Sequence, residues 1–123
     1  MLTDAVHHVS LCVRDLDASL VFYCDLLGLE KIDRPDFGIP GAWLDAGNAQ
    51  IHLIVAPDHV DTGRPPEKLS PLANHTSFAI HDYQATVDHL KSHGLEVLET
   101  SAEIGQLWVP DPSGHVIEFT VRR

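Results

Sequence analysis

Apolar and polar residues alternate from residue 6 to residue 13, the pattern of a strand with one buried face. A helical spacing of apolar residues follows, between a capping aspartate at position 15 or 17 and Gly28. Its apolar positions are Leu16, Leu20, Tyr23 and Leu27. Short extended segments at 30–34, 42–45 and 49–55 complete a predicted βαβββ module.

The second half of the chain repeats the first. His75 and Ser77 align with His8 and Ser10 at an offset of 67 residues, and Glu118 aligns with His52 at an offset of 66. A second set of strands is predicted at 75–80, 96–100, 106–109 and 116–121, with a helix opened by Asp82 and ended by Gly94. The pattern predicts one domain over 1–123, made of module 5–55, linker 56–73 and module 74–123. The fold class expected is α+β, two tandem βαβββ modules whose curved sheets form a cup.

Strand parity puts metal-ligand residue types on one face of the repeated strands. One face of each strand is apolar, and the other carries His8, His52, His75 or Glu118. We therefore expect these four residues to bind one divalent transition metal, Zn, Ni, Fe, Co or Mn, with positions left open for substrate. Polar and aromatic residues near them are candidates for substrate binding: Ser10, Cys12, Ser77, Trp43 and Trp108. Cys12 also suits a small buried apolar role, and both tryptophans also suit plain core positions.

Composition narrows the function classes. Eighteen acidic and eight basic residues give a net charge of −10, which disfavours nucleic acid and anionic membranes as partners. No apolar run is long enough to span a bilayer, so no membrane association is expected. Two cysteines without metal or redox spacing, and no secretory pattern at the start, favour a reducing cytoplasm. A small-molecule substrate is the expected partner.

The sequence resembles the vicinal oxygen chelate superfamily, which includes glyoxalase I, extradiol dioxygenases, methylmalonyl-CoA epimerase and bleomycin resistance proteins. The resemblance rests on HVSLCVRDLDASLVFYCDLLGLE, IHLI, NHTSFAI and DPSGHVIEF, and it covers nearly the whole chain. It implies metal ligands at His8, His52, His75 and Glu118, and a homodimer in which the site lies within one chain or across two. The resemblance is strongest to short proteins loosely called glyoxalase-like.

Departures from the family patterns bear on the reaction. Glyoxalase I usually has a glutamate at the position of His52 and an arginine at the position of Cys12, so a glutathione substrate is disfavoured. Extradiol dioxygenases use two histidines and one glutamate on Fe²⁺, and bleomycin-type binders sequester a drug without a catalytic metal. The sequence predicts a metal-dependent lyase or isomerase that stabilises an enolate-like oxyanion, with Glu118 as base or solely as ligand. An Fe(II)-dependent ring-cleaving dioxygenase and a non-catalytic drug-binding protein are the alternatives.

Overall fold

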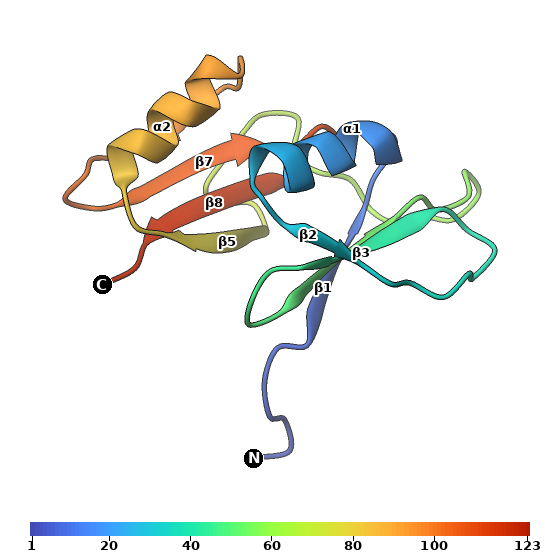
Figure 1. The fold of residues 1–123 in the computed structure, drawn as a ribbon. Helices are drawn as coiled ribbons and strands as arrows, with labels where there is room; N and C mark the ends of the chain where they lie inside the picture. Colours follow the sequence, from blue (N-terminus) through green and yellow to red (C-terminus); the bar gives the residue numbers. More distant parts are fainter. The chain divides into compact units, whose positions relative to one another are not determined.

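The computed structural model describes all residues 1–123 as two compact units, Met1–Gly63 and Arg64–Arg123 (Figure 1). The boundary falls inside the segment that the sequence predicts as a linker. Each unit is a four-stranded mixed sheet, with a helical segment between its first and second strands. The fold class is therefore the predicted one, α+β with two tandem βαβββ modules.

In the first unit the strand order is β1-β4-β3-β2, with β1 and β4 parallel and the other pairs antiparallel. The β1–β4 pair puts the last strand of the module beside its first. Its elements are β1 (His8–Cys12), α1 (Leu16–Leu20), η1 (Val21–Leu26), β2 (Glu30–Ile32), β3 (Gly41–Asp45) and β4 (Gln50–Ile54).

The helical segment of this unit differs from the expectation of one continuous α-helix. Asp15 caps α1 through Oδ1, which accepts the amide of Ala18 at 3.0 Å, but η1 is a π-helical turn. A π turn rotates less per residue than an α turn, which places the adjacent Phe22 and Tyr23 on the same buried face. The spacing of apolar residues in the sequence does not distinguish an α-helix from a π-helical turn.

The second unit has the same plan, with the order β5-β8-β7-β6 and a parallel β5–β8 pair. Asp82 caps α2 as Asp15 caps α1, because its Oδ1 accepts the amide of Ala85 at 3.0 Å. The helix lies along one face of its sheet (Figure 1). Its elements are β5 (His75–Ile80), α2 (Tyr83–Ser92), β6 (Leu98–Glu99), β7 (Gln106–Pro110) and β8 (Val116–Val121).

Burial follows the predicted parity on the helix side of both sheets. The predicted stripe of α2, Tyr83, Val87 and Leu90, is buried. The outer strands β2 and β6 are shorter than expected, at three and two residues. No helix of the chain has both the length and the apolar character needed to cross a membrane.

Candidate metal centre

In the first unit, His8 and His52 project from the same face of the sheet. Ser10 pairs with His52 in the β1–β4 ladder, so His8 lies diagonally beside His52. The two imidazole rings are stacked, with centroids 3.9 Å apart and an interplanar angle of 12°. Trp43 stacks at 4.5 Å from His52 with an angle of 8°. The structure therefore brings two of the four predicted ligands together in this unit.

His52 is a buried histidine that favours the neutral form. Its exposed fraction is 7%. Burial is the largest cause that lowers its pKa, and the charges of His8, His7 and Arg34 lower it further. Its Nε2 donates a hydrogen bond to Oε1 of Gln50 at 2.9 Å, which leaves the lone pair of the ring on Nδ1. A neutral imidazole with one nitrogen held by a neighbour has the protonation state required of a metal ligand.

His8 is exposed and is oriented by its neighbour in the chain. Nδ1 of His8 lies 2.8 Å from Nδ1 of His7, so one nitrogen donates to the other. The two rings meet edge to face, with centroids 5.1 Å apart. This contact fixes one nitrogen of His8 and leaves Nε2 for another partner.

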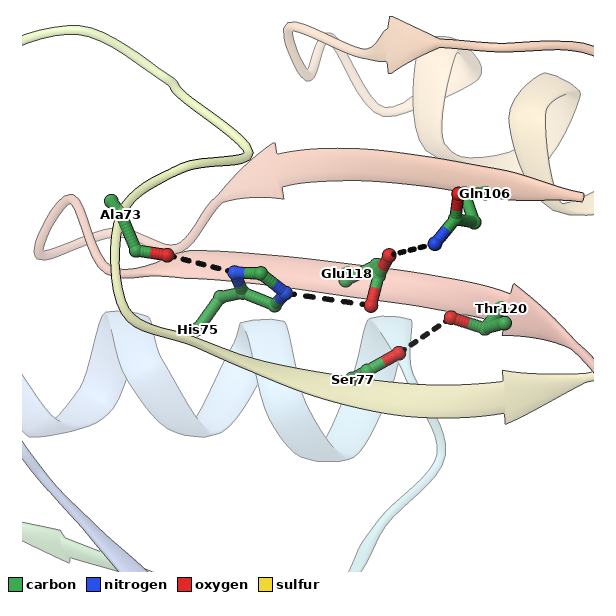
Figure 2. Close-up of polar contacts among 6 residues, drawn as sticks. All are labelled: Ala73, His75, Ser77, Gln106, Glu118 and Thr120. Atoms are coloured by element: carbon green, nitrogen blue, oxygen red, sulfur yellow. Dashed lines mark hydrogen bonds and ion pairs between the residues drawn. The ribbon is translucent and has the colours of Figure 1, made fainter. Parts of the chain in front are cut away.

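In the second unit, His75 and Glu118 form the corresponding pair (Figure 2). Nε2 of His75 lies 3.5 Å from Oε2 of Glu118, and Nδ1 of His75 donates to the carbonyl of Ala73 at 2.8 Å. In the neutral ring this places a lone pair on Nε2, opposite a carboxylate oxygen. Two such electron-rich atoms at this separation suit a shared cation, either a proton or a metal ion.

Glu118 is buried, and one of its two carboxylate oxygens accepts a hydrogen bond. Its exposed fraction is 6%, and Oε1 accepts a hydrogen bond from Nε2 of Gln106 at 3.0 Å, as Figure 2 shows. A buried carboxylate is stable only where charges or hydrogen bonds compensate for lost hydration. Gln106 supplies part of that compensation at Oε1, and a cation shared with His75 would supply it at Oε2.

The two pairs occupy equivalent register positions. Ser77 pairs with Glu118 as Ser10 pairs with His52, and Trp108 pairs with Glu118 as Trp43 pairs with His52. Each pair joins an exposed histidine on an edge strand to a buried ligand type on a central strand. Within neither unit do three or more His, Cys, Asp or Glu side chains form a group that could hold a metal ion. Three imidazoles and one carboxylate nevertheless fit the chemistry of a divalent transition metal.

The candidate substrate-binding residues lie in varied surroundings. Ser10 is exposed, whereas Cys12 is half-buried and forms no disulfide. Oγ of Ser77 is 2.7 Å from Oγ1 of Thr120 (Figure 2). Trp108 is only 8% exposed, and its Nε1 is buried without a hydrogen-bond partner. Their role in substrate binding stays a prediction.

Sequence reasoning missed the residues that orient the predicted ligands. Gln50 and Gln106 hold His52 and Glu118, and Arg34 lies close enough to affect the pKa of His52. Parity could have indicated Gln50, which lies two residues before His52 and shares its face of β4. The contact of Gln106 depends on the register between β7 and β8, which the pattern of one strand does not contain.

Comparisons with known proteins give consistent matches. A family model described as the Glyoxalase/Bleomycin resistance protein/Dioxygenase superfamily matches residues 5–119. Glyoxylase I 4 of Arabidopsis thaliana is 33% identical over 127 residues, covering 94% of this chain and 69% of that protein. A protein of Synechocystis named probable lactoylglutathione lyase is 29% identical and covers 91% of both chains. A solved structure from Bacillus anthracis, assigned to the glyoxalase family, has a TM-score of 0.80 at 23% identity, covering 100% of this chain and 98% of its own.

Proposed function

Because the chain belongs to the glyoxalase/bleomycin resistance protein/dioxygenase superfamily, we propose that it is a metal-dependent lyase or isomerase of the glyoxalase type. Its substrate would be a small carbonyl or hydroxy-carbonyl compound that binds the metal through two oxygens. The proposed ligands are His8, His52, His75 and Glu118. The homodimer and the cytoplasmic location expected from the sequence stay predictions.

The observation that carries this proposal is the equivalence of the two ligand pairs. His8–His52 and His75–Glu118 occupy the same ladder positions in two units that have only limited sequence in common. A lone histidine on a strand has many structural explanations, but a matched pair in each repeat favours a shared role. A divalent metal held by these residues would act as a Lewis acid on a substrate oxygen and so ease loss of a proton from the neighbouring carbon.

The residues of the chain supply the remaining steps. Glu118 is the proposed proton acceptor because it is the one carboxylate of the set and lies in a buried position, where a carboxylate is poorly hydrated. Gln106 holds one of its oxygens, which orients the other toward His75. The rings of His8, His52 and Trp43 form a stack on this face of the sheet, and the body of the substrate would lie against it.

Metal content tests the proposal. Purified protein is loaded with Zn²⁺, Ni²⁺ or Fe²⁺, dialysed and analysed for metal per chain, in parallel with His52→Ala. We expect about one equivalent in the parent and a sharp loss in His52→Ala, because removal of a ligand typically costs most of the affinity. His59→Ala is the matched control, since His59 is an exposed histidine outside both pairs.

Two outcomes would contradict the proposal. Equal metal content in the parent and His52→Ala would place any bound metal elsewhere in the chain. Absence of metal after loading would instead favour the drug-binding function that the name of the superfamily includes. The reaction class is tested separately. A panel of small α-hydroxy ketones and 2-oxo acids is incubated with the protein in D₂O, and NMR follows the exchange of the carbon-bound proton of each compound for deuterium.

A further inference from the structure

The C-terminal end of α2 carries two exposed histidines that lie outside the candidate metal centre, His89 and His93. They are four positions apart in the sequence, so their side chains lie on the same face of the helix, one turn from each other. The buried face of α2, formed by Tyr83, Val87 and Leu90, lies against the sheet (Figure 1). The two imidazoles are therefore open to solvent and take no part in the core.

The separation of the two rings matches that of two imidazoles bound to one metal ion. The ring centroids of His89 and His93 are 4.7 Å apart, with an interplanar angle of 58°. Two imidazoles that share an ion through bonds of about 2.1 Å have centroids about 4.5 Å apart at a right-angled geometry and about 5.2 Å apart at a tetrahedral one. The observed separation lies between these two values. Because each ring can turn about its metal–nitrogen bond, the tilt between the rings is compatible with shared binding.

Hydrogen bonds determine which nitrogen of His93 can bind an ion. Its Nδ1 lies 2.8 Å from the carbonyl oxygen of His89, which can only accept, so Nδ1 carries the proton. The hydroxyl of Ser92 donates to the same carbonyl at 2.7 Å, and its oxygen lies 3.2 Å from Nδ1 as a second acceptor. In the neutral ring the lone pair is therefore on Nε2. A histidine whose other nitrogen donates to a backbone carbonyl has the form that is usual for metal-ligating histidines.

The charges around the pair favour a cation. The C-terminal end of a helix carries a partial negative charge, and the net charge of the chain is −10. Lys91, which lies between the two histidines in the sequence, has its positive charge compensated, because its Nζ is 2.6 Å from Oε2 of Glu99. No third His, Cys, Asp or Glu side chain joins the pair to form a larger group of ligands. Water would therefore complete the coordination of a bound ion.

We propose that His89 and His93 form a further metal site, a two-histidine chelate for Ni²⁺ or Cu²⁺ on the surface of α2. Both ions bind imidazole well and favour tetragonal geometry with bond angles of about 90°. The ring separation of 4.7 Å is close to the value for such a geometry. A site with two protein ligands loses its ion during dialysis more readily than a site with four. Metal analysis after dialysis therefore measures the candidate metal centre and not this chelate.

Titration with Ni²⁺, followed by NMR of the imidazole carbon–proton resonances, tests the site. Paramagnetic Ni²⁺ broadens the resonances of a histidine that binds it, so each histidine reports its own midpoint. Ni²⁺ is preferred to Cu²⁺ because Cu²⁺ oxidises cysteine thiols, and the chain has two cysteines. We expect His89 and His93 to broaden together, at a Ni²⁺ concentration about 100-fold lower than a lone exposed histidine such as His81 requires.

Variants assign the binding to the pair. His93→Asn removes the imidazole but keeps an amide that can donate to the carbonyl of His89, so the end of the helix retains a hydrogen bond there. This variant should raise the midpoint of His89 about 100-fold, to that of a lone histidine. His81→Asn is the matched control and should leave both midpoints unchanged, because His81 is an exposed histidine just before the same helix. A midpoint of His89 that His93→Asn does not change, or equal midpoints for His81 and the pair, would overturn the inference.

The outcome at α2 is independent of the candidate metal centre. Ni²⁺ bound at that centre would broaden the resonances of His8, His52 and His75, which the same spectra record. Broadening of these three resonances without those of His89 and His93 would overturn the α2 site and leave the proposed function standing. Broadening of the α2 pair alone would support the α2 site without the other centre.

Discussion

At the scale of single residues, the two oxygens of Glu118 have different partners, and this difference defines its proposed role. Oε1 accepts a hydrogen bond from Gln106, whereas Oε2 faces His75 at 3.5 Å and is the oxygen available for chemistry. Glu118→Gln keeps the size and the hydrogen-bonding capacity of the side chain but removes its basicity. We therefore expect the fold to persist and the rate of proton exchange to fall by about 10²- to 10⁴-fold.

The measurement is the D₂O exchange rate per bound metal, so that weaker metal binding is separated from slower chemistry. Glu99→Gln serves as control, because Glu99 lies in an exposed ion pair with Lys91 at 2.6 Å and such pairs contribute little. If Glu118→Gln retained full turnover per metal, Glu118 would be a ligand alone.

Residue identity and strand parity selected His8, His52, His75 and Glu118 as one candidate set, and their joint role stays a prediction. The same reasoning did not select Arg34, because a long charged residue in a loop is usually exposed. Arg34 is instead half-buried over Gly41 and beside Phe37. These contacts join a loop to a strand, and periodicity within either segment contains no information about them.

At the scale of elements, the two capping aspartates are the local signals that the sequence made easiest to interpret. Asp82 binds the free amide of Ala85 at the start of α2, and Thr86 adds a bond from its hydroxyl to the carbonyl of Asp82. Asp82→Ala should lower the free energy of unfolding by about 1 kcal/mol, whereas Asp82→Asn should retain nearly all of it. Urea denaturation followed by circular dichroism measures both. Equal losses in the two variants would show that capping is not the role of Asp82.

The sequence pattern predicted neither the π-helical turn η1 nor the lengths of the outer strands. In η1 the amide of Leu27 bonds to the carbonyl of Phe22 at 3.0 Å, five residues earlier. The spacing of Leu20, Tyr23 and Leu27 fits an α-helix and a locally widened helix equally well. The widened turn accompanies the burial of two adjacent aromatic residues, Phe22 and Tyr23, and this burial is not encoded in the apolar spacing.

At the scale of the whole molecule, the repeat divides the candidate metal ligands equally between the two units. Each unit brings together one pair, His8–His52 or His75–Glu118, and a pair of ligands alone holds a transition metal weakly compared with a set of four. If all four act on one ion, then binding of that ion stabilises the folded state of both units together. On this proposal, metal-linked stability would be a property of the complete chain.

Thermal unfolding measures this linkage. Zn²⁺ at about 100 times its dissociation constant contributes about 2.7 kcal/mol, which corresponds to a rise in Tm on the order of 10 °C for a chain of this size. We expect this rise in the parent and in His59→Ala, and its near absence in both His52→Ala and His75→Ala, although these two substitutions lie in different units. A loss confined to one variant would assign the metal to one unit. The four residues would then form two separate pairs, which occupy equivalent positions only because the two modules have the same fold.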